Sequence, residues 1–593
     1  MAEERIEAAS RRQNSASTAL AVHYTVRMPH PASHNFEVEI AVSGAPGEVT
    51  LALPAWTPGS YKIRDFAKNV SSFRAQDSRG ALEVRQLDKQ RWRIAQGHQG
   101  RFKASFTLYA DEFSVRTPHL DDMHGFFLGT NLLPYIERET GFPAAARHSV
   151  TVVPPRGWKV ATGLKPVKGK AFTYLAEDYD ILGDSIFEIG THELHSFKAF
   201  GVRHDVAIVG WGNYNARQMV ADIKKLCETE PRLFGGVPYD YYLFVIHCFP
   251  DAGGGLEHLN SCVCGWPSFK FKPREEYDNF LRLVAHEYFH VWNVKRIRPA
   301  ILGPFDYSRE QHTRALWVME GLTQYYEKLW CARAGLLGDE ALLNSYAENI
   351  DREDNRPGRK VMSLEESSWL AWTKLYQADE NFINSGVSYY SRGSQVGFVL
   401  DARLRALTEG ERSLDDVMKA AMDRYGWPKP GFAEGEFEKL CAEVAGQSLD
   451  DFFDAHVRGT SELDYREALQ VYGLEFKHDK DGHTPWLGLT HGTKDGAFQV
   501  RTVEAGSPAM AAGLQVRDEL LALNGHKVTA KDFDDRLKDC RKGDKISLAL
   551  FRRGRLVEAH LTVAERPAGK LKLVRVAKPT ALQDKNFRRW LWK

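Results

Sequence analysis

The sequence His286-Glu287-Tyr288-Phe289-His290 decides how this chain is interpreted. Two histidines four residues apart on a helix project from the same face, so their imidazoles can bind a single zinc ion. A glutamate directly after the first histidine is the usual general base beside such an ion. The pentapeptide therefore predicts a zinc site on a helix, with a hydrolytic role if one coordination position stays open for water.

The residues around this pentapeptide predict two helices. Residues 277–291 have apolar positions at helical spacing and contain no Pro or Gly, and a second helical pattern runs from about 313 to 329. The second pattern holds Glu320 among apolar neighbours, where a carboxylate needs a partner such as a metal ion. We therefore predict Glu320 as the third zinc ligand beside His286 and His290. The alternative is two ordinary core histidines and a solvated glutamate.

Longer motifs carry a resemblance to a known family. Residues 286–292 read H-E-x-x-H-x-W and residues 317–325 read W-x-x-E-G-x-T-x-Y. Both resemble the gluzincin metallopeptidases, in which a glutamate on a second helix completes the zinc site. The closer resemblance is to the glycyl aminopeptidase family of PDZ-containing metallopeptidases. Three segments carry it: residues 290–299, the sequence L-P-A-W-T-P-G-S-Y at 53–61, and a PDZ-like segment near the C-terminal end. The resemblance covers about residues 20–566 and implies one Zn²⁺ per chain.

Cleavage of a peptide bond also needs a general base and a hydrogen-bond donor for the oxyanion. Glu287 lies one residue after a predicted ligand, where its carboxylate can accept the proton of the attacking water. The segment Tyr389-Tyr390-Ser391-Arg392-Gly393 resembles the Y-x-K-G segment that carries the oxyanion tyrosine of related aminopeptidases, with arginine in place of lysine. This resemblance implies Tyr390 as the donor. The alternative is an aromatic residue that packs on the core at a helix start.

An exopeptidase must also recognise a free α-amino group. The glycine-rich run Gly253-Gly254-Gly255-Leu256-Glu257-His258 follows the apolar residues 241–246, which predicts a buried strand followed by an edge that a substrate backbone can approach. The run resembles the exopeptidase motif whose glutamate pairs with the substrate ammonium. Glu257 is therefore the predicted anchor, with Gly254 and Gly255 beside the substrate. The alternative is a simple turn, whereas a phosphate-binding loop is excluded because no Lys-Ser/Thr follows.

Length and composition restrict the class of protein. A chain of 593 residues is too long for one core and predicts three to four domains. The net charge of +1 gives no electrostatic footprint for nucleic acid, and no apolar run approaches the ~20 residues that a membrane span needs. Seven scattered cysteines do not resemble a disulfide framework, and the first twenty residues lack a signal-peptide core. We therefore predict a cytoplasmic protein, or a periplasmic or secreted one if a leader was removed.

The patterning along the chain predicts a multidomain α+β fold. A disordered tail over 1–18 precedes alternating apolar residues, which predict a β-sandwich-like N-terminal domain over 19–190. Residues 191–468 are predicted to form a thermolysin-like catalytic domain with an α/β half and a helical half. A PDZ domain over 469–566 and a C-terminal tail over 567–593 complete the chain.

The predicted PDZ domain contains a candidate binding loop. Turn signals at Asn524-Gly525 and helix-end signals at Ser507-Pro508 and Ala512-Gly513 resemble those of bacterial PDZ domains. Leu487-Gly488-Leu489 resembles their carboxylate-binding loop, whose backbone N–H groups can hold the C-terminus of a peptide. The alternative is a PDZ domain that packs against the enzyme and binds nothing.

Three functions stay open from the sequence. The first is a zinc aminopeptidase acting on peptides, for which the family resemblance implies a preference for N-terminal Gly or Ala that no residue shows. The second is a zinc endopeptidase with substrates presented by the PDZ domain, and the third is a non-catalytic PDZ scaffold. The intact zinc motif favours an enzyme. Arg64 and Arg116 lie in segments that resemble the family, but the sequence assigns neither a role.

Overall fold

The computed structural model describes residues 19–45, 47–138 and 141–593, so the tail predicted at 1–18 lies outside the described residues. The chain divides into two compact units. Unit 1 consists of Met1–Val291 and Ile301–Gln311, and unit 2 consists of Trp292–Ala300 and His312–Lys593.

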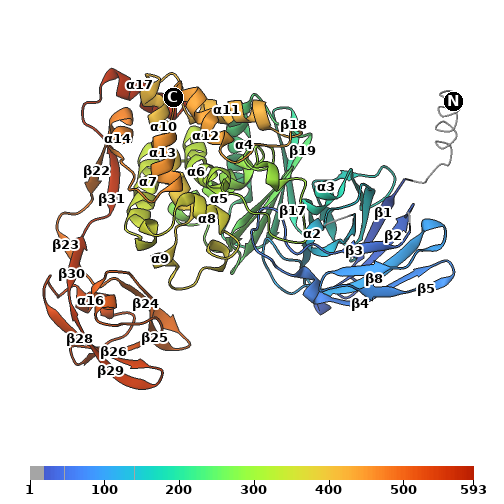
Figure 1. Cartoon of the computed structure of the whole chain (residues 1–593), viewed down its shortest axis with the longest axis horizontal. Helices are drawn as coiled ribbons and strands as arrows, with labels where there is room; N and C mark the ends of the chain where they lie inside the picture. Colours follow the sequence, from blue (N-terminus) through green and yellow to red (C-terminus); the bar gives the residue numbers. More distant parts are fainter. Residues whose placement is uncertain (1–18, 46, 139–140) are drawn as a thin grey trace, which may run out of the picture. The chain divides into compact units, whose positions relative to one another are not determined.

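Unit 1 contains an eight-stranded sheet with the order β14-β15-β12-β1-β2-β8-β4-β5 (Figure 1). The alternation seen in the sequence explains it, because β2 buries Phe36, Val38, Ile40 and Val42 and exposes the residues between them more. The strands are β1 (Ala21–Arg27), β2 (Asn35–Ser43), β4 (Val70–Asp77), β5 (Gly80–Leu82), β8 (Phe102–Tyr109), β12 (Arg147–Val153), β14 (Lys165–Pro166) and β15 (Thr173–Ala176).

Two four-stranded sheets share a hydrophobic core with this large sheet, with the orders β13-β16-β10-β9 and β11-β3-β7-β6. This layered packing is the sandwich-like N-terminal β domain predicted from the sequence. The strands are β3 (Val49–Ala52), β6 (Val84–Gln86), β7 (Arg91–Ile94), β9 (His119–Leu120), β10 (His124–Leu128), β11 (Tyr135–Glu137), β13 (Lys159–Ala161) and β16 (Ile186–Gly190).

The part of unit 1 predicted as the α/β half contains a five-stranded sheet with the order β17-β18-β19-β21-β20. Its middle strands β18, β19 and β21 run parallel, and the fully buried residues of β19 agree with a strand covered on both faces. Helix α5 (Arg274–Phe289) packs on β20 and β21, and α4 (Ala216–Thr229) packs on β17. The strands are β17 (Glu193–Ala199), β18 (Val202–Gly210), β19 (Tyr241–Phe249), β20 (Gly255–His258) and β21 (Ser261–Pro267).

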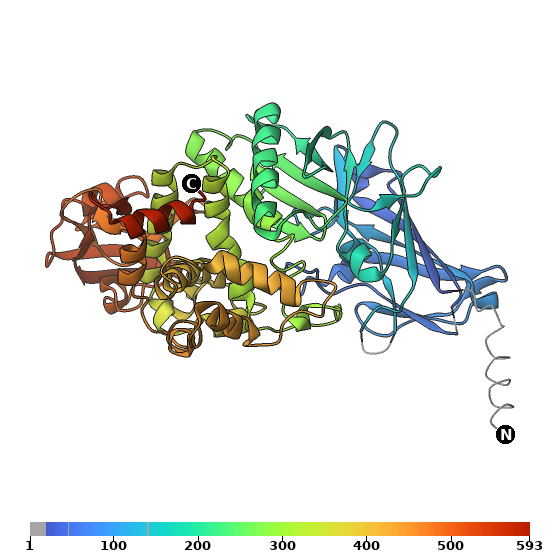
Figure 2. The ribbon, with the colours of Figure 1, turned by 90° about the horizontal axis from the view of Figure 1, so that it is seen from above.

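Unit 2 begins with a helical half built around α10 (Figure 2). Helix α10 packs against the π-helix η6 and against α6, α7 and α14. The second predicted helix begins at Trp317 rather than at residue 313, because Thr313 and Arg314 bind Glu434 instead. The elements are η6 (Trp317–Gly321), α6 (Leu322–Arg333), α7 (Asp339–Asp354), α8 (Leu364–Trp369), α9 (Phe382–Ser385), α10 (Tyr389–Leu407), α11 (Leu414–Tyr425), α12 (Glu436–Ala445), α13 (Asp450–Phe453) and α14 (Arg466–Tyr472).

The PDZ part of unit 2 is a sheet with the order β24-β25-β26-β28-β29, with its own hydrophobic core (Figure 1). Strand β27 pairs with β26, and the short helices α15 and α16 complete the domain. The elements are β24 (Leu489–Lys494), β25 (Ala497–Val503), α15 (Pro508–Ala511), β26 (Glu519–Leu523), β27 (His526–Lys527), α16 (Phe533–Leu537), β28 (Lys545–Arg552) and β29 (Arg555–Thr562).

Two short ribbons flank the PDZ sheet in the sequence. Strand β22 (Leu474–His478) pairs with β31 (Leu571–Arg575), and β23 (His483–Trp486) pairs with β30 (Ala564–Pro567). The chain then returns to the helical half as α17 (Ala581–Trp590), which packs on α14 and buries Trp590 completely. Residues 567–593, predicted as a tail, thus contain β31 and α17.

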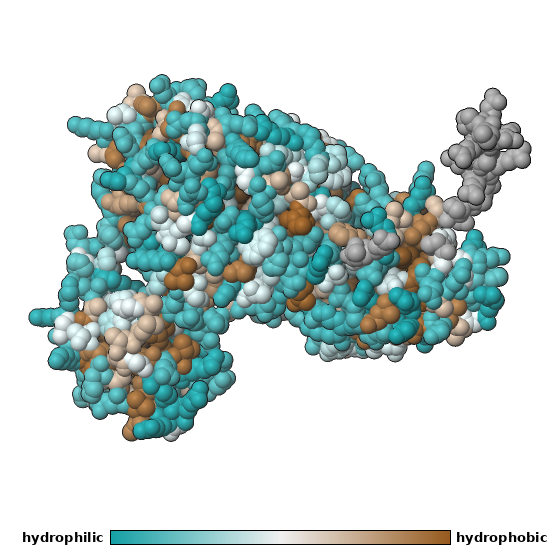
Figure 3. All heavy atoms as spheres, viewed as in Figure 1, coloured by the Kyte–Doolittle hydropathy of each residue, from teal (hydrophilic) through white to brown (hydrophobic). Residues whose placement is uncertain are grey.

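These elements confirm the multidomain α+β fold predicted from the sequence. Over the described residues on the face in Figure 3, hydrophobic side chains lie singly or in small groups among hydrophilic ones. Within the described ranges, no helix has both the length and the apolar character needed to cross a membrane.

Candidate active site

Helix α5 presents the histidine pair. His286 and Glu287 lie in its last turn, and His290 follows at the helix end. The ring centroids of His286 and His290 are 4.7 Å apart, as expected for side chains one turn apart on the same face. All three side chains are buried, so the predicted helix is present and its histidines face the protein interior.

Glu257 lies beside this helix in unit 1. It is on the edge strand β20, is 3% exposed, and belongs to a group in which ligand atoms of Glu257, Glu287 and His290 all lie within 4.8 Å of one another. Among the described residues, no hydrogen-bond partner reaches Oε1 of Glu257. A buried carboxylate oxygen without a partner destabilises the fold by about 1–3 kcal/mol or more, so this oxygen is suited to a ligand that brings a positive charge.

Steric and backbone constraints explain why the predicted exopeptidase motif contains glycine at positions 254 and 255. A Cβ added to Gly255 would lie 2.0 Å from Oε1 of Glu287, so only glycine lets the strand pass the predicted general base. Gly254 has a φ of +77°, in the left-handed region that favours glycine. The backbone of the glycine-rich run therefore lies directly against the helix that carries Glu287.

Glu320 lies in the π-helix η6 of unit 2 and is 2% exposed. A π-helical turn leaves backbone carbonyls without their usual partners, and such turns are frequent at functional sites. The side-chain amide of Asn293 donates to the carbonyls of Val318 and Met319, at 2.9 and 3.0 Å. Sequence reasoning missed this role of Asn293, although its place three residues after His290 in the family-like segment was a signal.

Two glycines bring the helices of Glu320 and Tyr390 into backbone contact. A Cβ on Gly321 would lie 2.6 Å from the Cα of Gly393, so η6 and α10 can approach this closely only with glycine at both positions. Tyr390 is the second residue of α10. Burial, and then the charge of Glu320, raise the pKa of Tyr390 well above its usual value, so its phenol stays protonated and can donate a hydrogen bond.

Arg392, which replaces the lysine of related motifs, has a structural role. Its guanidinium is buried and donates to Asp354, to Gln395 and to the carbonyl of Ser461, at 3.2, 2.8 and 3.2 Å. These contacts fix the start of α10. The arginine that stands here in place of the lysine of related motifs therefore serves the packing of helices within unit 2.

The candidate PDZ loop at 487–489 immediately precedes and begins β24. Gly488 has a φ of +74°, and its carbonyl accepts from the N–H of Glu504 at 2.8 Å. Nearby, His491 of β24 and Asp534 of α16 form a hydrogen bond of 2.8 Å that joins the two elements. The backbone of the loop is thus held in place by a hydrogen bond, and the His491–Asp534 hydrogen bond connects β24 to α16.

The PDZ domain also contacts the helical half within unit 2. The side chain of Asn384 on α9 donates to the carbonyl of Val503 at 2.8 Å and accepts from the N–H of Ala505 at 2.7 Å. An ion pair between Arg517 and Glu380 also joins the two parts, but it is exposed and therefore contributes little to stability. These two hydrogen bonds agree with the alternative stated for the PDZ domain, in which it packs against the rest of the enzyme and binds no peptide.

His247, His258, Cys262 and Cys264 are all buried in unit 1. His247 and His124 bind the two oxygens of Glu188, at 2.9 and 3.2 Å, and Glu188 is 0% exposed. Burial raises the pKa of Glu188, but the charges and hydrogen bonds of the two histidines outweigh it and lower the pKa to about 2. His258 binds Asp184, and the thiols of Cys262 and Cys264 are buried.

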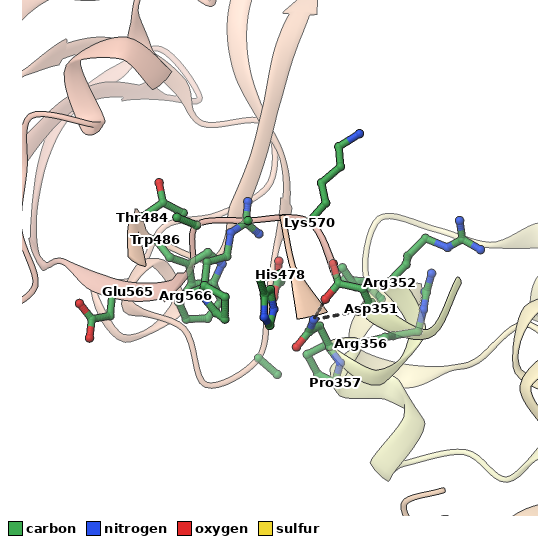
Figure 4. A pocket seen from close by; sticks show the side chains of 17 residues that line it. Asp351, Arg352, Arg356, Pro357, His478, Thr484, Trp486, Glu565, Arg566 and Lys570 are labelled. Atoms are coloured by element: carbon green, nitrogen blue, oxygen red, sulfur yellow. Dashed lines mark hydrogen bonds between the residues drawn. The ribbon is translucent and has the colours of Figure 1, made fainter. Parts of the chain in front are cut away.

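A cavity of about 780 Å³ lies in unit 2 between the end of α7 and the ribbons that flank the PDZ sheet (Figure 4). Charged groups of both signs line it, among them Arg356, Arg566 and Glu565. It contains none of the residues predicted for catalysis or for binding.

Comparison with known proteins gives matches in the predicted order. A model of the Peptidase M61 N-terminal domain matches residues 23–191, a model of M61 glycyl aminopeptidase matches 279–396, and a PDZ domain model matches 499–544. A search of curated proteins found no match.

The chain is also similar to solved structures. A crystal structure of an aminopeptidase N family protein from Idiomarina loihiensis has a TM-score of 0.89 and 28% sequence identity, over 96% of this chain and 100% of that chain. An M1 zinc metallopeptidase from Deinococcus radiodurans has a TM-score of 0.47 and 15% identity, over 75% of this chain and 96% of that chain. Yeast LTA4 hydrolase in complex with bestatin has a TM-score of 0.46 and 12% identity, over 77% and 72% of the two chains.

The fold, the histidine-bearing helix, the match to the M61 glycyl aminopeptidase model and the similarity to the aminopeptidase N family structure define the class of protein as a metallopeptidase, a hydrolase. The resemblance to the glycyl aminopeptidase family of PDZ-containing enzymes is confirmed, because models of its N-terminal domain, its peptidase domain and a PDZ domain all match.

Proposed function

We propose that this metallopeptidase is a zinc aminopeptidase that removes the first residue from peptides with a free N-terminus. The observation that carries the proposal is the buried carboxylate of Glu257, which lacks a partner at Oε1 and lies within 4.8 Å of ligand atoms of Glu287 and His290. The α-ammonium of a peptide supplies the missing charge. Since the α-nitrogen and the first carbonyl carbon of a peptide are only about 2.5 Å apart, an anchor so close to the base selects the first peptide bond.

The zinc ion would be held by His286, His290 and Glu320. Two imidazoles and a carboxylate are a donor set that suits catalytic zinc, and all three side chains are buried. The contacts of Asn293 support Glu320 as the third ligand, because its amide binds the carbonyls of the two residues just before Glu320. Asn293 is three residues after His290 in the chain, so the Cα atoms of these two residues are at most about 11 Å apart. When bound, the ion supplies Lewis-acid chemistry that polarises the scissile carbonyl and acidifies the attacking water.

The residues of the chain then divide the remaining work. The carboxylate of Glu287 accepts the proton of the attacking water and delivers it to the leaving amine. The phenol of Tyr390 donates a hydrogen bond to the oxyanion that develops on the scissile carbonyl. Glu257 holds the α-ammonium, so that the substrate carbonyl is presented to both groups in one orientation.

The finer specificity is part of the same proposal. A preference for small first residues, Gly or Ala, follows from the resemblance to the glycyl aminopeptidases. The PDZ loop at 487–489 is proposed to hold the C-terminus of a peptide, although the contacts of Asn384 favour a packing role as the second candidate. A titration of the protein with peptides that end in a free or an amidated C-terminus separates the two roles of the PDZ domain.

The experiment that tests the proposed function is hydrolysis of a panel of aminoacyl anilides, each free or N-acetylated, with and without a chelator. We expect hydrolysis of the free Gly and Ala anilides, no hydrolysis of the acetylated ones, and recovery of the chelated enzyme with Zn²⁺. Equal hydrolysis of free and acetylated substrates would instead favour the endopeptidase.

A further inference from the structure

The N-terminal β domain contacts the predicted ammonium anchor through a glycine. Gly59 belongs to the L-P-A-W-T-P-G-S-Y segment at 53–61, which has no role in the predicted site. A Cβ added to Gly59 would lie 2.6 Å from both carboxylate oxygens of Glu257. The backbone of this loop therefore lies directly against the carboxylate.

The loop that carries Gly59 is fixed from within unit 1. The indole N–H of Trp56 donates to the carbonyl of Asp306 at 3.0 Å, and the guanidinium of Arg64 donates to Oγ of Ser60 at 2.9 Å. Gly59 itself has a φ of +82°, a conformation that glycine adopts without strain. Arg64 thus supports the turn in which Gly59 lies.

A second residue of the N-terminal β domain holds the strand that carries the anchor. Arg116 donates from Nη2 to the carbonyl of Gly255 at 2.9 Å, and its Nη1 would lie 3.2 Å from a Cβ on Gly254. Among the described strands, β20 lies at the edge of its sheet and pairs only with β21, and Gly255 within it and Gly254 before it add flexibility to its backbone. The position of Glu257 therefore depends on contacts from outside the sheet.

We propose that Gly59 and Arg116 are positioning residues that complete the amino-terminus subsite, so that the N-terminal β domain sets the recognition of a free α-amino group. Gly59 fixes the carboxylate of Glu257, and Arg116 fixes the backbone of its strand beside Glu287. This inference rests on the proposed function, because it assigns Glu257 to the substrate ammonium. It adds that the anchor is aligned by a different domain.

The test is Gly59→Ala compared with Gly201→Ala. Gly201 has a φ of +77° in the turn between β17 and β18, and a Cβ there meets nothing within 4 Å, so the two variants share backbone strain but not the collision. We expect Gly59→Ala to raise KM for free aminoacyl anilides by about tenfold or more, because the anchor loses a charge-assisted hydrogen bond, and to lower kcat by a smaller factor, because the substrate carbonyl is less well oriented. Gly201→Ala should leave both constants within about twofold.

Arg116→Lys provides a second test that does not depend on the folding of the glycine variant. Lysine keeps the positive charge but not the planar fork of the guanidinium, so a shift of β20 should raise KM and reduce the preference for free over acetylated substrate. A role in stability alone would lower the melting temperature without changing that preference.

The two proposals fail in different ways. If the wild-type enzyme hydrolyses acetylated and free anilides equally, the proposed function is wrong. If the wild type discriminates and Gly59→Ala and Arg116→Lys keep its KM and its preference, the positioning role is wrong. Should Gly59→Ala not fold, the result with Arg116→Lys decides.

Discussion

Glu188 and Glu257 are both buried carboxylates of unit 1, but their surroundings differ. Glu188 lies between two sheets, and each of its oxygens binds an imidazole, from His124 and from His247. Glu257 is almost as buried, yet no partner among the described residues reaches its Oε1. The first carboxylate is satisfied by the fold, whereas the second is suited to a ligand.

In the proposed function, the hydrogen bonding of the two carboxylates distinguishes their roles, whereas their residue type and burial do not. Removal of a satisfied buried carboxylate destabilises the fold, because its partners are left without a counter-charge. A buried carboxylate oxygen without a partner lowers stability until a ligand binds to it. Mutation of Glu188 should therefore lower the stability of the protein, whereas mutation of Glu257 should weaken substrate binding.

The largest effect is expected for Glu287→Gln. The amide cannot accept the proton of the attacking water, so kcat should fall by about 10²–10⁴-fold. The zinc content, measured by elemental analysis, should equal that of the wild type, since Glu287 is not a predicted ligand. Activity within tenfold of the wild type would show that another group is the base.

The next effect concerns the satisfied carboxylate. Glu188→Ala should lower the free energy of unfolding by about 3–5 kcal/mol, because it breaks a buried pair and leaves two imidazoles without their partner. Chemical denaturation measures this loss, with Glu177→Ala at an exposed position as the control. A change within about 0.5 kcal/mol would contradict the structural role.

Glu257→Ala should show the reverse pattern. KM for free aminoacyl anilides should rise by about 10–100-fold, because the ammonium loses a charge-assisted hydrogen bond. The free energy of unfolding should stay the same or increase, since a buried oxygen without a partner is removed. A loss of stability as large as that of Glu188→Ala would remove the distinction between the two carboxylates.

The smallest effect is a dependence of stability on pH. The pKa of Glu188 is lowered to about 2 in the folded protein from the usual 4.5, so its contribution is complete above about pH 4.5 and is lost as the pH falls toward 2. The pKa of His124 is raised despite its burial, so its contribution is lost as the pH rises through that pKa. Unfolding curves of the wild type and Glu188→Gln at several pH values should converge in acid. Parallel curves would contradict the assignment.

The sequence predicted those parts of the site that depend on local spacing. The helix with His286 and His290, and the glycine-rich approach to Glu257, follow from residue types a few positions apart. It did not predict that Gly59 meets Glu257, because this contact joins segments far apart in the chain. Nor did it predict the π-helix that Asn293 holds, since helical periodicity does not distinguish a π-turn from an α-turn.

The C-terminal helix α17 was not predicted either. Its burial depends chiefly on Trp590, whose indole N–H donates to the phenol of Tyr325 at 2.7 Å. The helix has ten residues, four of them charged, and it buries only Asn586, Phe587 and Trp590. Tertiary packing decides such a helix.

The return of the chain through β31 and α17 has a consequence for genetics and for engineering. The PDZ domain is inserted in the helical half, so a premature stop codon or a proteolytic cut cannot remove it cleanly. Loss of the last dozen residues would deprive Tyr325 of Trp590, on the helix directly after the π-turn of Glu320. A version without the PDZ domain has to be made by internal excision, with β22 rejoined to β31 by a short connector.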